Sequence, residues 1–256
     1  MFPLKNQRGE REAEQRPRFQ TTPNPAISCK KEKRMDYPAL LAVLQQHANP
    51  ERAVPMQAYM KHRFTYFGIG KPQLAHLCSP FFKGAAKQPV DWDFVRRCWD
   101  DPHRELQYAA LEYLKKMQQR LTPQDIPRLQ TLITEKSWWD SADVLDRIVG
   151  DIALRHPEVN NVLLAWSTDD NIWLRRVAID HQLLRKQHTD TALLETIICN
   201  NLGQTEFFIN KAIGWALRDY SKTNPEWVQG FIDRHRHEMA KLSLREAGKY
   251  LPPKAV

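Results

Sequence analysis

The segment from Lys136 to Asp143 combines residue types that can do chemistry on a charged substrate. Its sequence, KSWWDSAD, places two adjacent tryptophans and two acids at a predicted helix start. On a helix, Trp139 and Asp143 are four residues apart, so an indole and a carboxylate lie on the same face, one turn from each other. In a chain of formal net charge +8, an acid beside an exposed aromatic ring indicates a point of chemistry within a basic binding surface.

The composition favours a polyanionic partner. The chain of 256 residues holds 38 Lys and Arg against 30 Asp and Glu, and its isoelectric point is about 9.3. Such a balance suits nucleic acid or an anionic membrane surface. Part of the excess lies in the first 34 residues, which are rich in Lys and Arg, so charge alone is limited evidence for nucleic acid.

The cysteines and histidines indicate no metal centre. The four cysteines are far apart and lack a paired spacing such as CxxC, so we expect free thiols in a reducing compartment. His235 and His237 alternate on a predicted helix, which points their rings apart, and we interpret them as surface residues. The chain has no apolar run of about 18 residues and no apolar N-terminal segment typical of a secretory signal. We therefore expect a soluble cytoplasmic protein that uses neither metal nor cofactor.

The chain divides near residue 35. Residues 1–34 are rich in Pro, Arg and Gln with almost no apolar periodicity, and we predict a disordered basic extension. This extension is either an arm that grips nucleic acid, a solvated tail, or upstream sequence if Met35 is the true start. From Asp36 onward apolar residues recur at helical spacing, so residues 35–256 form a single predicted domain.

The predicted domain is all-α. Strand signals are nearly absent, and the short connections often carry Pro, Asp, Thr or Asn, which favour a helix start. Beyond residue 70 the pattern predicts helices at 72–81, 91–100, 103–119, 123–135, 138–155, 157–166, 170–185, 189–201, 206–222 and 225–238.

An internal repeat runs through the second half of the chain. Trp139, Trp173 and Phe208 align at offsets of 34 and 35 residues. Two helices per unit and a period near 35 to 45 residues are the signature of an α-solenoid of the HEAT or TPR kind. We predict antiparallel helix pairs that form a curved right-handed superhelix with a basic concave face. The same register predicts buried positions at Ala109, Val144, Ala178 and Ile213.

Asp143 is unusual within this repeat. Its register position is occupied in sibling helices by Tyr108, Val177 and Ala212, so repeat packing does not explain a carboxylate there. The alternative is an exposed pair with Arg147 at i+4, worth only about a few tenths of a kcal/mol. From the residues alone the two interpretations are even.

Basic and aromatic residues recur on the corresponding helices. Trp173, Arg175 and Arg176 fall on the helix predicted at 170–185, and the next repeat carries Lys211 and Trp215. Arginine near an aromatic ring suits phosphate binding and sugar packing. Tryptophans in helical repeats are, however, more often core residues than contacts.

Five segments resemble one family of proteins. They are PMQAYMKHRFTYFGI, RELQYAALEYL, KSWWDSAD, WLRRVAI and FINKAIGWALRDYSK, and they occur in the order that the family shows. The chain is similar over residues 36–250 to the AlkD-type, HEAT-repeat DNA alkylpurine glycosylases. The resemblance implies hydrolysis of the N-glycosidic bond of DNA purines alkylated at N3 or N7, such as 3-methyladenine and 7-methylguanine.

The resemblance also implies roles for individual residues. Asp143 matches the catalytic carboxylate, and Trp139 and Trp215 match aromatic walls around the backbone of the lesion. Arg176 matches a phosphate contact, with Arg175 as the alternative because the alignment there runs around a short gap.

Further DNA contacts complete the expected surface. Tyr59 matches a DNA-facing position of the family, and Lys211 and Trp173 come from the repeat register. The expected partner is alkylated double-stranded DNA, and the protein is expected to be a monomer associated with the nucleoid when bound. The resemblance implies that the deoxyribose is reached without enclosing the base.

A different class of function competes with this interpretation. Helical solenoids commonly act as scaffolds, so the fold alone does not certify an enzyme. The alternative is a catalytically silent DNA-binding or protein scaffold. Such a protein would be expected to have lost the acid or the tryptophans, and this chain keeps them.

Overall fold

The computed structural model describes residues 34–251. Within this range the chain forms thirteen α-helices, several short 3-10 turns and no strand, which confirms the all-α prediction. The predicted extension at 1–34 lies, except for its last residue, outside the described range. Cys78, Cys98 and Cys199 are free thiols, as expected, and Cys29 also lies outside this range.

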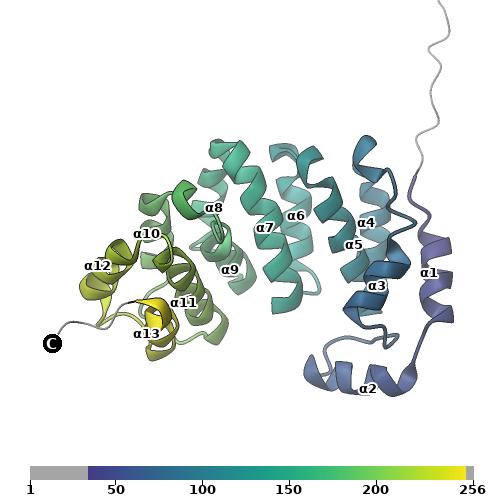
Figure 1. Cartoon of the computed structure of the whole chain (residues 1–256), viewed down its shortest axis with the longest axis horizontal. Coiled ribbons are helices and arrows are strands. Elements are labelled where there is room, and N and C mark those ends of the chain that lie inside the picture. The colour runs from purple at the N-terminus through teal and green to yellow at the C-terminus, as the bar shows by residue number, and fades with distance from the viewer. Residues whose placement is uncertain (1–33, 252–256) are drawn as a thin grey trace, which may run out of the picture. The chain divides into compact units, whose positions relative to one another are not determined.

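The helices follow one another along the chain with short connections (Figure 1). Their bounds are α1 Tyr37–Gln46, α2 Pro50–Tyr59, α3 Lys71–Cys78, α4 Trp92–Asp100, α5 Arg104–Met117, α6 Ile126–Thr134, α7 Trp139–Arg155, α8 Asn160–Trp166, α9 Ile172–Asp180, α10 Thr191–Cys199, α11 Phe207–Ser221, α12 Pro225–His235 and α13 Lys241–Ala247.

Short polar residues start many of these helices. A side-chain oxygen of the N-cap residue accepts a hydrogen bond from a backbone N–H of the first turn, which satisfies a donor that the helix itself leaves free. The residues that do so at α1, α2, α4, α9, α10 and α12 are Asp36, Asn49, Asp91, Asn171, Asp190 and Asn224. These caps explain why such short connections suffice between the helices.

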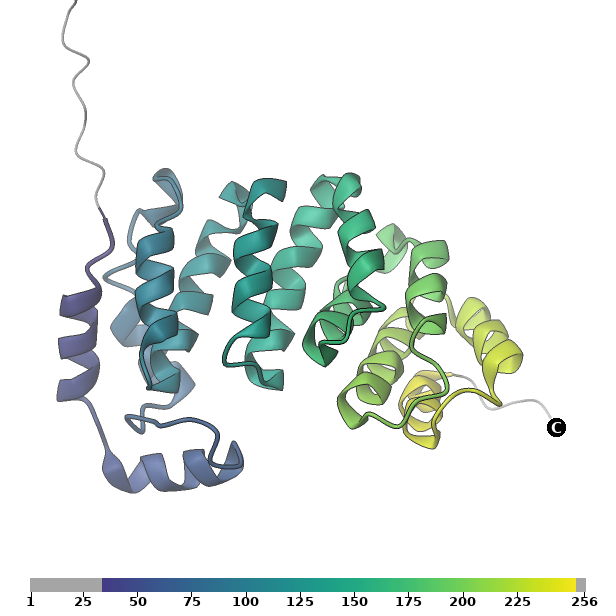
Figure 2. The ribbon, with the colours of Figure 1, turned by 180° about the vertical axis from the view of Figure 1, so that it is seen from behind.

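The helices form an α-solenoid. Helices α5, α7, α9 and α11 contact one another in chain order, and α4, α6 and α8 pack against α5, α7 and α9 respectively. Figure 2 shows the same order of helices from behind. The repeat register is confirmed at Ala109, Ala178 and Ile213, which are buried, whereas Val144 is only half-buried.

One predicted helix is too long. The pattern predicts helix over 170–185, but α9 ends at Asp180 and a turn follows. Leu184 and Lys186 both adopt left-handed backbone angles, with φ of 68° and 53°, which cannot continue a right-handed helix. The apolar residues of this turn continue the helical spacing without continuing the helix.

A buried glutamate places α2 beside the stack. Glu105 is fully buried at the start of α5 and accepts hydrogen bonds from the backbone N–H groups of Phe67, Gly68 and Ile69 at 2.9 to 3.1 Å. Gly68 has φ of 89°, and a Cβ there would lie 2.0 Å from the carbonyl oxygen of Asn49. The loop after α2 is thereby tied to α5, which positions the end of α2 near the start of α7.

Candidate active site

Asp143 is held by an arginine from the next repeat. Nε of Arg176 donates a hydrogen bond to Oδ1 of Asp143 at 2.8 Å, and Nη2 lies 2.8 Å from the same oxygen. The Asp143 side chain is 22% exposed. Burial raises its pKa above the ordinary value, and the Arg176 charge opposes that rise. The alternative pairing with Arg147 is therefore wrong, because Asp143 bonds across helices to Arg176.

Arg176 is buried, which corrects its predicted role as a phosphate contact. Its side chain is 2% exposed. Nη1 donates to the carbonyl oxygen of Phe208 at 2.7 Å, while Nε and Nη2 face Asp143. All three guanidinium nitrogens are thus occupied inside the protein, so the residue supports Asp143 and is not available to bind DNA. The alternative, Arg175, is half-buried and stays a prediction.

Trp139 and Tyr59 meet at the start of α7. Tyr59 is 69% exposed and contacts the indole of Trp139 edge-on, with ring centroids 6.0 Å apart and an interplanar angle of 83°. Both rings line a cavity of about 420 Å³ between α2, α5 and α7. Other residues of its wall are Met56, Met60, Tyr66 and Tyr108. The structure therefore brings together two predicted site residues that lie 80 positions apart.

Trp138 and Trp173 point into the core. Trp138 packs against Trp173 and Phe208 at centroid distances of 5.7 and 5.1 Å, and the guanidinium of Arg63 lies 4.2 Å from its ring centroid. Trp173 is 8% exposed and belongs to the hydrophobic core. Its predicted DNA contact is therefore wrong, because the repeat register places this side chain under the surface.

Trp215 is surrounded by cations. Its ring centroid lies 5.2 Å from Arg176, 5.7 Å from Lys211 and 5.8 Å from Arg218. Lys211 and Arg218 each contact a different oxygen of Glu246 on α13 at 2.6 Å. The predicted DNA contact of Lys211 would therefore compete with an existing ion pair. Through Arg176, the structure connects the half-buried indole of Trp215 to Asp143.

Asp140 has a structural role. It is 5% exposed and accepts hydrogen bonds from Arg104 at 2.7 and 3.0 Å and from the hydroxyl of Tyr108 at 2.6 Å. Arg104 is itself fully buried. These bonds tie the first turn of α7 to α5 and so position Trp139 and Asp143. The spacing of Arg104 and Tyr108, four residues apart in RELQYAALEYL, is the signal that could have revealed this network.

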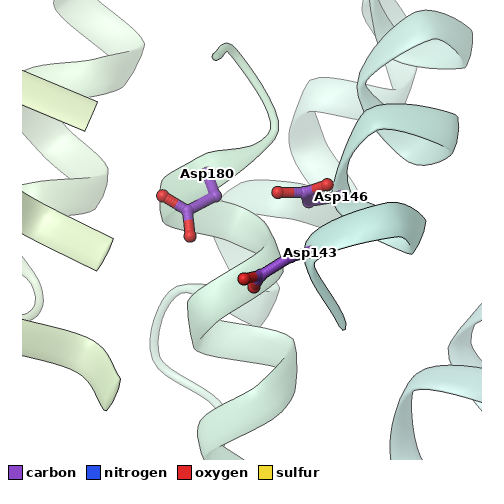
Figure 3. A group of neighbouring side chains, drawn as sticks. All are labelled: Asp143, Asp146 and Asp180. Atoms are coloured by element: carbon purple, nitrogen blue, oxygen red, sulfur yellow. The ribbon is translucent and has the colours of Figure 1, made fainter. Parts of the chain in front are cut away.

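Two further acids lie behind Asp143. Figure 3 shows Asp143 and Asp146 extending from α7 toward Asp180 of α9. Oxygens of the three carboxylates lie within 4.8 Å of one another, and Asp146 and Asp180 are each 1% exposed. Neither Asp146 nor Asp180 lies in a sequence motif, and their proximity depends on how α7 and α9 cross, so the sequence alone does not reveal them.

A short basic segment follows α2. Lys61, His62 and Arg63 are all exposed, and Lys61 and His62 have left-handed φ angles of 56° and 54°. Such angles are uncommon for residues other than glycine. Met60 separates the segment from Tyr59, and the charges of the segment form no conspicuous sequence pattern, so the sequence alone does not mark it as a candidate DNA contact.

No helix among residues 34–251 has the length and apolar character needed to cross a membrane.

Comparison with known proteins identifies the family. The sequence profile of a family described as DNA alkylation repair enzyme matches residues 40–251. A solved structure described as a predicted DNA alkylation repair enzyme from Enterococcus faecalis is 34% identical, with a TM-score of 0.75, and the match covers 81% of this chain and 98% of the other. AlkD2 from Streptococcus mutans shares the fold, with 13% identity, a TM-score of 0.55 and coverage of 72% and 91%. Among curated proteins, none matches the chain. Because the profile match spans well over half of the sequence, the chain belongs to the DNA alkylation repair enzyme family.

Proposed function

We propose that the protein is a DNA glycosylase that hydrolyses the N-glycosidic bond of purines alkylated at N3 or N7 in double-stranded DNA. The observation that carries this proposal is the state of Asp143. Its Oδ1 is held by Arg176, the side chain is partly exposed, and no described residue bonds its second oxygen, Oδ2. One carboxylate oxygen is therefore positioned by the protein while the other can face a substrate.

The chemistry of the substrate explains why so few groups suffice. A purine alkylated at N3 or N7 is cationic and leaves as a neutral base, so no general acid is needed to protonate it. The remaining task is to stabilise the positive charge that develops as the deoxyribose approaches an oxocarbenium ion. A partly dehydrated carboxylate does this electrostatically, and it can also orient or deprotonate the attacking water. In this mechanism Asp143 is the catalytic residue.

The indoles next to Asp143 support the same step. Trp139 lies one turn earlier on α7, and Trp215 is connected to Asp143 through Arg176. A cation near an indole face is stabilised by about 0.5 to 2 kcal/mol. In the proposal these two rings flank the sugar of the lesion.

The proposed enzyme does not enclose a flipped base. The described groups closest to the Asp143 carboxylate are the guanidinium of Arg176 and the carboxylates of Asp146 and Asp180, and they offer no set of amides or hydroxyls that could read the edge of a base. Selectivity then follows from the charge and lability of the lesion. Bulky cationic adducts should be accepted, and neutral lesions should be refused.

DNA is held in the proposal by the exposed segment Lys61 to Arg63, by Tyr59 and by Arg175. Phosphate contacts from Lys and Arg supply affinity without reading sequence. The alternative function, a catalytically silent scaffold, would bind DNA through the same surface without releasing bases.

The decisive test is release of 3-methyladenine and 7-methylguanine from methylated duplex DNA by the purified protein and by Asp143→Asn. This substitution keeps the shape of the side chain and removes its charge. We expect the variant to lose about 10² to 10³ in single-turnover rate. Its DNA affinity should stay within about threefold of the parent value, since Asp143 is assigned no phosphate contact.

Asp151→Asn is the matched control. Asp151 lies on the same helix as Asp143, about two turns further along, and it pairs with Arg155 outside the site. Equal release by the parent protein and Asp143→Asn would remove Asp143 from the mechanism. Binding without release by the parent protein would favour the scaffold.

A further inference from the structure

A buried polar group lies behind Asp143 where α7 and α9 cross. Asp146 and Asp180 are each 1% exposed, and their carboxylates approach that of Asp143 (Figure 3). The crossing is tight, because a Cβ at Gly150 would lie 2.0 Å from the carbonyl oxygen of His181. The helices therefore cannot separate the two buried acids without losing this close packing.

Asp180 has no hydrogen-bond partner. Neither of its carboxylate oxygens accepts a hydrogen bond within the described residues, although both are buried. The nearest cation is Nη2 of Arg176 at 3.7 Å from Oδ2, which is too long for a hydrogen bond. Asp146 accepts one hydrogen bond, from the backbone N–H of Arg147 at 2.5 Å. Two buried carboxylates with so few donors are costly if both are ionised.

A divalent cation is a poor solution for this group. Mg²⁺ and Ca²⁺ take six or more oxygen ligands, usually including water, and both acids here are closed to solvent. The guanidinium of Arg176 already lies between Asp143 and Asp180, at 2.8 and 3.7 Å from their oxygens. A proton fits the group better, because a protonated carboxyl is neutral and so removes one of two buried negative charges that lie within 4.8 Å of each other.

We propose that Asp146 and Asp180 together carry one proton. This proton keeps Asp180 from competing for the guanidinium of Arg176, which therefore stays paired with Asp143. Asp180 is then a positioning residue, which acts on the reaction through Arg176. Its effect on excision depends on the glycosylase function proposed above, whereas the shared proton itself depends only on the packing of α7 and α9.

Electrostatics support this arrangement. The pKa of Asp180 is raised to about 7, mainly by burial; the charge of Arg176 opposes this rise and the charge of Asp143 contributes to it. Burial and the charge of Asp180 likewise raise the pKa of Asp146. When Asp180 loses its proton, it competes with Asp143 for Nη2 of Arg176. Excision should therefore fall as the pH rises through about 7.

Other charged groups around Asp180 are already accounted for. Arg147 on α7 faces the pair, and the pKa of His181 is lowered to about 3 by burial, so that ring is neutral. Helix α8 carries no charged residue. The charged residues of α6, α10 and α11 all belong to ion pairs outside the group; they are Arg128, Glu195, Lys211, Arg218 and Asp219.

The first experiment is single-turnover excision of 7-methylguanine from about pH 6 to pH 9, corrected for spontaneous loss of the base. Asp180→Asn mimics the protonated carboxyl, so its rate at about pH 6 should stay within about threefold of the parent rate. The parent rate should fall about fivefold or more toward pH 9, whereas the variant should lose less than about twofold. An equal alkaline decline in both proteins, or a variant inactive at pH 6, would overturn the role of Asp180. Asp151→Asn should follow the parent profile.

The second experiment measures urea unfolding of the same three proteins across about pH 5 to pH 9. The pKa of Asp180 is higher in the folded parent than in the unfolded chain. The resulting stability is fully present below the unfolded-state pKa and is lost as the pH rises through the folded-state pKa of about 7. The stability of Asp180→Asn relative to the parent should therefore increase with pH. A constant difference would contradict the shared proton. Because urea unfolding needs no catalysis, it tests whether the pair carries a proton even if the parent releases no base and the proposed function fails.

A third measurement distinguishes the proton from a metal. Unfolding is repeated with millimolar Mg²⁺ or Ca²⁺ and with EDTA. We expect the same midpoints in all three conditions. If either cation stabilises the parent but not Asp180→Asn, the group would be a metal site and the proposed proton would be wrong.

Discussion

Arg176 on α9 and Asp143 on α7 form an ion pair in which Nε and Nη2 both lie 2.8 Å from the same oxygen, Oδ1. The arginine is buried and the acid is partly exposed. Arg176 is therefore the inner residue that supports the pair, and Asp143 is the outer residue that can contact a substrate. This asymmetry separates the expected effects of changing each residue.

Arg176→Ala should destabilise the protein and lower excision without changing the salt dependence of DNA binding. Removing one partner of a buried ion pair costs about 3 to 5 kcal/mol, since the remaining charges are left uncompensated. Urea unfolding gives the stability, and the slope of log Kd against log salt gives the number of phosphate contacts. If Arg176→Ala does not fold, Arg176→Gln keeps a donor for Phe208 and allows the same titration. A slope reduced by about one would restore the phosphate contact at Arg176.

Lys61→Ala and Arg63→Ala should each reduce that salt slope by about one, because both side chains are exposed beside Tyr59. Folding stability should change by less than about 0.5 kcal/mol for Lys61→Ala. Lys116→Ala is the control, because Lys116 is exposed at the opposite end of α5. Equal slopes for all variants and the parent protein would place the DNA elsewhere.

Tyr59→Ala should lower excision by up to about tenfold, because the edge-on contact with Trp139 is worth about 0.5 to 1.5 kcal/mol. Stability should change little, since the tyrosine is 69% exposed. Tyr59→Phe keeps the ring contact and should behave like the parent protein. Should the phenylalanine variant be as slow as the alanine variant, the hydroxyl rather than the ring would be the important group.

Asp140→Ala should lower the free energy of unfolding by about 3 to 5 kcal/mol, because it leaves the buried guanidinium of Arg104 without its carboxylate. Glu135→Ala removes an exposed partner of Arg96 and should cost less than about 1 kcal/mol. Urea unfolding of both variants tests the difference. Similar small losses in the two variants would mean that Asp140 does not hold α7 to α5.

Helix positions and the repeat could be predicted from the sequence because they depend on local pattern. Capping residues such as Asp190 and Asn224 mark helix starts at the positions where the structure has them. Apolar spacing predicted α7 to within one residue, and it failed in the turn after Asp180, where backbone angles override the pattern.

The sequence by itself determined the all-α fold, the pairing of helices and the segment that carries Trp139 and Asp143. Only the tertiary structure decided which acid of that segment is buried against Arg104, and which of the predicted DNA contacts lie inside the protein. Burial and ion pairing are set by neighbouring helices more than 30 positions away, as between Asp143 and Arg176. No local pattern contains that information, because spacing shows which residues share one face of a helix but not which residues of another helix meet that face.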